Sequence, residues 1–173
     1  TTVSVENTYG YGQVNGTTDE VVPNLRRVAD GIHRHGAVCM VQITHGGRRD
    51  RYDTSAWVPP FGPSFSRELL HRSFAAEMEA HDMARATRGY ADTARRVREA
   101  GVDGVEISCL SASLVGQFWT PLTNQRSDRY GGSLQNRMRF GIEVLEAVRV
   151  EVGGDFVVGI RVSGDEIVDG GLS

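Results

Sequence analysis

The amino-acid sequence predicts a parallel α/β fold, present as an internal segment of a (β/α)8 barrel. Apolar runs of strand length alternate along the chain with segments whose apolar residues recur at helical spacing. A helix between two successive strands returns the chain across the sheet, so the strands run parallel. Polar residues follow the strands at their carboxyl ends, where a barrel places its active site. The chain has 173 residues, whereas a complete barrel takes about 250, so we expect residues 1–173 to form one partial barrel domain.

The first predicted helix spans residues 19–35, and the first complete strand follows it. Apolar residues recur there every three or four positions, and Pro23 lies in the first turn, where its missing N–H costs little. Gly36 ends this helix. Residues 37–43 form a continuous apolar run, AVCMVQI, of the kind that a parallel strand buried on both faces requires. Residues 1–5 are interpreted as a remnant of an earlier strand.

The later elements follow a long polar and aromatic loop that contains three prolines. In order, they are a helix from about residue 82 to Gly101, a strand at 103–107, a loop, a helix at 134–152 and a strand at 156–162. An open doubly wound sheet is the alternative to the barrel. Because no GxGxxG motif follows any strand, the dinucleotide-binding form of that alternative is disfavoured.

Composition and charge exclude several classes of partner. Hydrophobic residues make up 39% of the chain, and 19 basic against 22 acidic residues give a net charge of −3. This balance gives no electrostatic reason to expect nucleic acid or an anionic membrane as a partner. The apolar runs are shorter than the roughly 20 residues of a membrane span, and no signal segment opens the chain. We therefore expect a cytoplasmic protein with a small-molecule substrate, and its homo-oligomerisation is left open.

The chain has two cysteines, Cys39 and Cys109, which lie in separate apolar segments. This placement is typical of small buried hydrophobic residues in a reducing compartment rather than of a disulfide or a metal pair. No metal site is predicted.

Three long stretches carry a family resemblance: HGAVCMVQITHGGRR, QFWTPLTNQRSDRYGGSLQNRMRF and GDFVVGIRVSGDE. With them, the chain resembles the FMN-dependent barrel family that includes old yellow enzyme, 2,4-dienoyl-CoA reductase and trimethylamine dehydrogenase. The resemblance implies that the stretches are the third strand, the signature after the fourth strand, and the fifth strand, so that the chain covers about strands 2 to 5. Within the family, QFW, HRSF and GIRVSGDE most resemble the branch that demethylates N-methylated amino acids such as N-methylproline.

The resemblance implies two contacts with FMN. Gln42, at the end of the third strand, would hydrogen-bond through its side-chain amide to the pyrimidine edge of the flavin. Arg161, at the end of the fifth strand, would place a positive charge near flavin N1 and O2, where negative charge accumulates on reduction. The structural alternatives are a rim residue bonded to backbone for Gln42 and a salt bridge at the barrel end for Arg161.

Two further residues are candidates for the substrate pocket. His45 follows the third strand and could line the pocket or orient its own glycine-containing loop. Trp119 could form part of an aromatic wall for a cationic amine, or it could pack in the core where the loop meets the barrel.

The rest of the signature is interpreted as structural. Gly131 and Gly132 permit a tight turn, and Ser133 can cap the helix that starts at residue 134. Arg126, Asp128 and Arg137 are expected to form an ion-paired loop core.

Three serines occupy the positions where the family carries its catalytic side chains. Family members that reduce activated alkenes have a His, then an Asn or His three residues on, then a Tyr two residues further. Aligned through VEI and QF, these positions fall on Ser108, Ser111 and Ser113. The demethylase branch keeps a serine at the first position and usually has His at the other two. A serine hydroxyl without an adjacent base is a poor proton source near neutral pH, so alkene reduction is disfavoured.

We therefore expect a flavin-dependent oxidoreductase with hydride transfer to or from flavin N5, and oxidative demethylation of an N-methylated amine or amino acid as the favoured reaction. Amine oxidation needs the neutral amine held near the flavin but no protein acid. One alternative is an ene reductase with NAD(P)H as electron donor, and another is a degenerate barrel that binds flavin or serves as a scaffold. The loops for the FMN phosphate, and the region where longer relatives carry an iron–sulfur cluster, lie outside this segment, which by itself is expected to be inactive.

Overall fold

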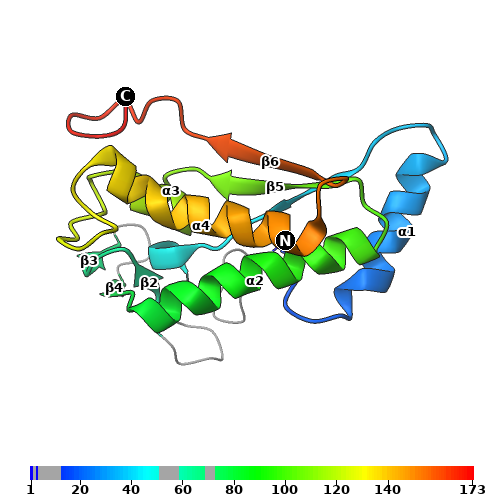
Figure 1. Cartoon of the computed structure of the whole chain (residues 1–173), viewed down its shortest axis with the longest axis horizontal. Coiled ribbons are helices and arrows are strands. Elements are labelled where there is room, and N and C mark those ends of the chain that lie inside the picture. The colour runs from blue at the N-terminus through cyan, green and yellow to red at the C-terminus, as the bar shows by residue number, and fades with distance from the viewer. Residues whose placement is uncertain (2, 4–12, 51–58, 69–72) are drawn as a thin grey trace.

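The computed structural model describes residues 1, 3, 13–50, 59–68 and 73–173 of the chain. Its elements in chain order (Figure 1) are α1 (Val21–His33), β1 (Met40–Ile43), the 3-10 helix η1 (Gly47–Arg49), β2 (Phe61–Gly62), β3 (Ser66–Arg67), β4 (Phe74–Glu77), α2 (Ala80–Glu99), β5 (Gly104–Cys109), α3 (Leu114–Trp119), α4 (Leu134–Val152) and β6 (Val157–Val162). The helices and strands predicted from periodicity all occur, in the predicted order.

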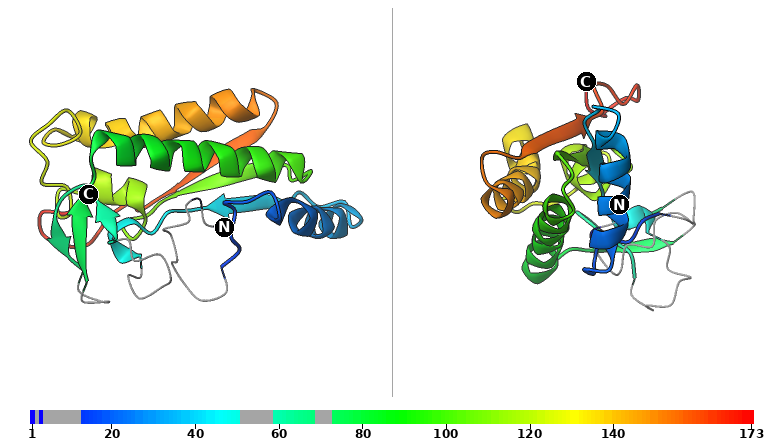
Figure 2. Two further views of the ribbon diagram at one scale, coloured as in Figure 1. Left: turned by 90° about the horizontal axis from the view of Figure 1, so that it is seen from below. Right: turned by 90° about the vertical axis from the view of Figure 1, so that its right-hand side faces the viewer.

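Three strands form a parallel sheet in the order β1-β5-β6. The register sets Gln42 level with Glu106, and Ser108 level with Arg161. Helices α2 and α4 lie side by side along one face of this sheet (Figure 2). The predicted parallel α/β arrangement is therefore confirmed.

The chain start lies beside β1. The Val3 N–H donates to the Thr44 carbonyl at 3.2 Å, and the Thr44 N–H donates to the Thr1 carbonyl at 3.0 Å. In a parallel pair of strands, one residue bonds through its N–H and its carbonyl to two residues of the adjacent strand that lie two positions apart, as Thr44 does here. Thr1 and Val3 thus extend the sheet next to β1, and the other residues of the predicted remnant at 1–5 lie outside the described part of the chain.

Local side-chain bonds set the ends of the elements. The α4 helix begins as predicted, with the Ser133 hydroxyl accepting from the Asn136 N–H at 3.3 Å. The α2 helix starts two residues before the predicted position, because Glu79 and Asp82 form a reciprocal capping box. The first strand is shorter than the predicted 37–43, because the Cys39 N–H donates to the Asp103 carboxylate at 2.7 Å instead of to a neighbouring strand.

Two features lie where the sequence predicts only loop. Strands β2, β4 and β3 form a small mixed sheet after η1. The six-residue helix α3 lies inside the loop that was predicted between β5 and α4. Both are built from segments too short to show a clear period in the sequence.

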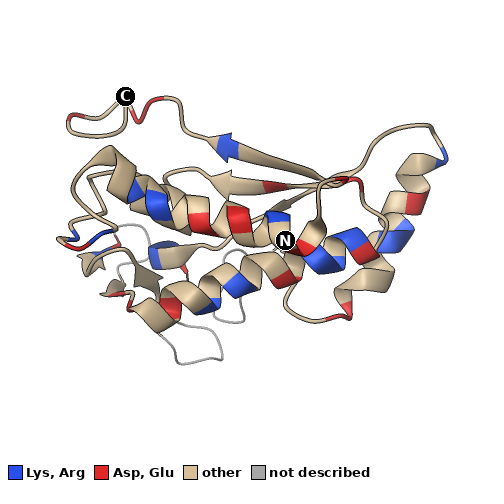
Figure 3. Ribbon diagram, viewed as in Figure 1, with Lys and Arg blue, Asp and Glu red and all other residues tan. Residues whose placement is uncertain are grey.

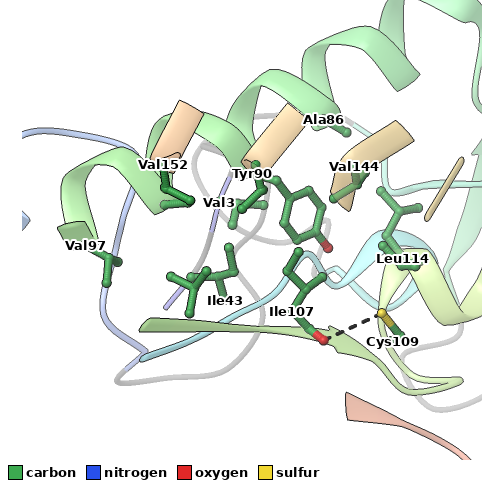
Figure 4. Close-up of a cluster of buried hydrophobic side chains, with 14 of the residues drawn as sticks. Val3, Ile43, Ala86, Tyr90, Val97, Ile107, Cys109, Leu114, Val144 and Val152 are labelled. Carbon is green, nitrogen blue, oxygen red and sulfur yellow. Dashed lines mark hydrogen bonds between the residues drawn. The ribbon is translucent and has the colours of Figure 1, made fainter. Parts of the chain in front are cut away.

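The hydrophobic core lies between the parallel sheet and the helices (Figure 4). Ile43 and Ile107 from the sheet meet Tyr90, Val97 and other side chains of α2 and α4. Cys39 and Cys109 are both buried and free, as predicted. Burial raises the pKa of Cys109 to about 12, so this thiol is protonated at neutral pH.

Charged side chains lie mainly on the outer helices and the loops (Figure 3). Strands β5 and β6 each contain a single charged residue, Glu106 and Arg161, seen as the red and blue bands on those arrows. Among the helices in the described ranges, none is long and apolar enough to cross a membrane.

Two valines on α4 test the assignment of its core face. Val148 is 0% exposed and Val150 is 85% exposed. In the full-length protein, Val148→Ala should lower the free energy of unfolding by about 2 kcal/mol, because it deletes buried methyl groups and leaves a cavity. Val150→Ala removes the same atoms from the surface and should change the free energy of unfolding by less than about 0.5 kcal/mol. Urea titration at unchanged slope measures both, and equal losses would contradict the assigned face.

Candidate functional site

Side-chain alternation places a polar group of residues on the sheet face opposite the helices. Val105, Ile107 and Cys109 belong to the core beneath the helices, so the residues between them point the other way. A Cβ atom at Gly104 would lie 2.7 Å from Val157 Cβ and 3.2 Å from the end of Met40, which confirms that the three strands share this face. Toward the carboxyl ends of the strands, the same face carries Gln42, Glu106, Ser108 and Arg161.

Glu106 joins the two predicted flavin contacts. The Gln42 side-chain Nε2 donates to Glu106 Oε1 at 2.7 Å. Arg161 Nη1 lies 3.7 Å from the same oxygen, and the two side chains are 62% and 33% exposed, respectively. Glu106 was not among the candidates predicted from the sequence, although a single charge inside an apolar strand was an available signal.

This group has the donors and acceptors that the pyrimidine edge of a flavin requires. One Gln42 N–H bonds Glu106, which leaves the amide a second N–H and a carbonyl oxygen. The Arg161 guanidinium has five N–H donors and is largely exposed. The residues therefore fit the cofactor that the sequence predicts, and direct contact of Gln42 and Arg161 with FMN stays a prediction.

The three serines have different surroundings. Ser108 lies in β5 level with Arg161 on the polar face. The Ser113 hydroxyl lies 2.8 Å from the carbonyl oxygens of both Ser108 and Leu110, to which it donates. The Ser111 hydroxyl lies 3.4 Å from the Ser163 hydroxyl. Among the three serines at the family's catalytic positions, Ser113 thus uses its hydroxyl to stabilise the turn before α3.

Glu166, a carboxylate that was not selected from the sequence, lies near Ser111 and bonds Thr120 and Leu172. Burial by itself would raise the pKa of Glu166, but the nearby Ser111 hydroxyl and the hydrogen bonds from the Thr120 hydroxyl and the Leu172 N–H bring it below its ordinary value. Glu166 is therefore ionised at neutral pH. It connects the segment after β6 to the end of α3.

His45 orients its own loop. Its side chain is buried, and its Nδ1 lies 3.0 Å from the Gly47 nitrogen, whose N–H donates to it, and 3.3 Å from Asp50 Oδ2. By alternation from Gln42, His45 is on the helix side of the sheet. The structure thus favours the loop-orienting alternative over the substrate-pocket assignment.

Trp119 packs against α4. A Cβ atom at Gly141 would lie 2.7 Å from Trp119 Nε1 and 3.0 Å from Cζ2, so the indole fills the space that this glycine leaves. The structure again favours the packing alternative over an aromatic wall of the substrate pocket.

Gln117 ties the loop after β1 to α3. It is fully buried, and its Nε2 donates to the carbonyls of Gly46 at 2.8 Å and Ala112 at 3.1 Å. Its Oε1 accepts from the Arg48 N–H at 3.0 Å. Gly47 has φ +61°, and a Cβ there would overlap Gln117 Oε1. Glycine is therefore required at this position for both conformation and space.

Asn124 closes the signature loop. Its side-chain Nδ2 donates to the carbonyls of Phe118 at 2.6 Å and Tyr130 at 2.8 Å, and its Oδ1 accepts from the Arg126 N–H at 3.1 Å. All of its bonds run to backbone, so this residue, to which the sequence analysis gave no role, is structural.

Of the three residues predicted to form the ion-paired core of the signature, Arg126 and Asp128 pair and Arg137 does not, and Arg126 also lies 3.3 Å from Glu77. Arg126 and Asp128 bond at 2.6 Å, and this bond lowers the pKa of Asp128 and raises the pKa of Arg126. Arg137 instead donates to the carbonyls of Trp119 at 2.6 Å and Gly132 at 2.5 Å. Arg126 Nη1 also donates to two carbonyls next to the small sheet, those of Pro63 and Met78.

Comparison with known proteins agrees with this geometry. The sequence profile of the family described as NADH:flavin oxidoreductase / NADH oxidase matches residues 6–173. The chain is 48% identical over 163 residues to an N,N-dimethylglycine/sarcosine dehydrogenase of Chromohalobacter salexigens, covering 94% of this chain and 24% of the relative. It is 46% identical to a probable N-methylproline demethylase of Rhizobium meliloti, covering 88% and 22%. It is also 46% identical to a multifunctional alkene reductase/demethylase of Caballeronia cordobensis, covering 92% and 23%.

Solved structures give the same result. A 2-naphthoyl-CoA reductase complex superposes with a TM-score of 0.91 at 29% identity, over 99% of this chain and 28% of that chain. Histamine dehydrogenase from Rhizobium sp. 4-9 superposes with a TM-score of 0.83 at 31% identity, over 89% and 23%. The chain spans about a quarter of the length of the curated relatives described above.

Asn124 provides a test of the signature loop. Asn124→Asp replaces two buried N–H donors by a carboxylate that faces two carbonyl oxygens, and it should lower the free energy of unfolding of the full-length protein by about 3 kcal/mol. The matched control is Asn136→Asp in the first turn of α4, where a carboxylate is favoured by the helix dipole. Equal urea midpoints for the two variants would contradict a structural role for Asn124.

Proposed function

The chain belongs to the NADH:flavin oxidoreductase / NADH oxidase family, and we propose that the full-length protein is an FMN-dependent oxidoreductase that demethylates an N-methylated amine or amino acid. The chain would be part of its FMN-binding (β/α)8 barrel domain, about strands 2 to 5. The loops and further strands that complete the site would come from the rest of the protein.

The observation that carries this proposal is the polar face with Gln42 and Arg161. Gln42 would hold the pyrimidine edge of FMN through its free amide N–H and carbonyl. Arg161 would offset the negative charge that develops at that edge on reduction. When bound, FMN supplies the acceptor for a hydride.

The substrate class follows from the relatives and from the serines. Two relatives at 46% identity or more are named for N-methylated amino acids. Demethylation removes a hydride from the N-methyl carbon, and water then releases formaldehyde and the demethylated amine, so no protein acid has to protonate the substrate. The Ser113 hydroxyl already donates to backbone carbonyls, which agrees with a reaction that needs no acid at that position.

A second candidate function is reduction of activated alkenes with NAD(P)H. The observation that favours it is the 46% identity to a protein named for both alkene reduction and demethylation. A barrel that binds flavin without turnover is the third possibility, motivated by Ser111 and Ser113 at the family's catalytic positions.

Anaerobic reduction of the full-length protein, purified with its flavin, distinguishes the three functions. We expect N-methylproline or sarcosine to bleach the flavin absorbance and to release formaldehyde, and proline or glycine, which lack the methyl group, to leave it unchanged. Bleaching by NADPH alone would assign the protein to the reductases. No bleaching with either donor would support a barrel without turnover and overturn the proposed activity.

A variant of Arg161 tests the proposed charge. Arg161→Met should slow flavin reduction by the N-methyl substrate by about a hundredfold, because it removes a positive charge next to the group that becomes reduced. Arg88→Met, at an exposed position of α2, removes the same charge far from the polar face and should leave the rate unchanged. Stopped-flow absorbance measures both rates, and an unaffected Arg161→Met protein would remove Arg161 from the flavin site.

A further inference from the structure

We propose that Glu106 is a positioning residue that fixes the orientation of the Gln42 amide and partly neutralises Arg161, and that it thereby lowers the reduction potential of the bound flavin. This inference rests on the proposed binding of FMN to the polar face. It assigns a role to a residue that makes no direct flavin contact in the proposal.

Glu106 is the only charged residue of β5, and its side chain is 33% exposed on the polar face, opposite the buried Val105 and Ile107. Paired or hydrogen-bonded groups replace the water that such a carboxylate loses on folding. Its partners in the structure are Gln42 and Arg161, one from each neighbouring strand.

The bond to Gln42 determines which way its amide faces. An ionised carboxylate only accepts hydrogen bonds, so the nitrogen of the amide must face Glu106, as it does at 2.7 Å. The reversed amide would bring two oxygen atoms together. Glu106 therefore leaves a defined pair, one N–H and one carbonyl oxygen, for a ligand on this face.

The contact with Arg161 changes the charge that a ligand meets. The carboxylate oxygen lies 3.7 Å from Nη1, close enough to offset part of the guanidinium charge without a short hydrogen bond. A positive charge beside the pyrimidine edge stabilises the reduced flavin more than the oxidised flavin, because reduction adds negative charge there. A neighbouring carboxylate opposes that effect, and its removal should make the flavin easier to reduce.

Glu106→Gln in the full-length holoprotein isolates the charge, because glutamine has the same shape and can still accept from Gln42. Sulfite adds reversibly to oxidised flavins as an anion, so its dissociation constant reports the local charge without any turnover. We expect Glu106→Gln to bind sulfite about tenfold more tightly and to have a higher midpoint potential in equilibrium with a reference dye. Glu106→Asp keeps the charge and should stay close to the wild-type values.

The matched control is Glu99→Gln. Glu99 is also paired with an arginine, at 2.6 Å from Arg95, but on the outside of α2. Its removal changes the net charge equally and should alter neither the sulfite affinity nor the potential. In an Arg161→Met background the effect of Glu106→Gln should shrink, since Glu106 is proposed to act through Arg161. If the glutamine variant does not fold, Glu106→Met removes the charge together with the hydrogen bond to Gln42 and should also bind sulfite more tightly.

The outcomes separate this inference from the proposed function. A wild-type protein that contains and binds no FMN would overturn both. A wild-type protein with FMN, and a Glu106→Gln variant with unchanged sulfite affinity and potential, would overturn the role of Glu106 alone. Equal shifts in Glu106→Asp and Glu106→Gln would show that the charge is not responsible and would likewise overturn the inference.

Discussion

The alternation of side chains along β5 is the constraint on which the rest of this structure depends. Val105, Ile107 and Cys109 face the helices, where they complete the core. Because side chains alternate along a strand, Glu106 and Ser108 lie on the opposite face. Since β1 and β6 are hydrogen-bonded to β5 in fixed register, their polar residues join the same face. A shift of one residue would exchange core and polar face along the whole strand.

Buried polar side chains then fix the loops around that face. Gln117 bonds the loop after β1, Asn124 closes the signature loop on itself, and Arg126 connects that loop to the small sheet. Each of them donates mainly to backbone carbonyls that would otherwise be unsatisfied. These three residues of the signature therefore bond backbone groups at fixed distances, which gives each of them a structural role.

The sequence predicted what periodicity and local chemistry determine. The main strands and helices follow from apolar spacing, and the Ser133 cap follows from its position before a helix. The small sheet and α3 have segments of two to six residues, which are too short to show a period. The side on which His45 lies could not be decided, because it depends on the strand register. Glu106 was missed because its importance comes from partners on two other strands, 64 residues away for Gln42.

The distribution of polar groups also bears on the direction of the chemistry. A site that protonates a substrate needs a group whose proton is free to leave, whereas the Ser113 hydroxyl is bonded to backbone carbonyls and the Ser111 hydroxyl lies 3.4 Å from the Ser163 hydroxyl. The face with Gln42, Glu106 and Arg161 is instead suited to binding a group that becomes negatively charged on reduction. The positive charge of Arg161 favours that reduction, and the negative charge of Glu106 limits the effect. A balance of this kind would suit the proposed reaction, in which the flavin takes electrons from an amine and then passes them on. A flavin held too firmly in its reduced state would complete the first step and impede the second.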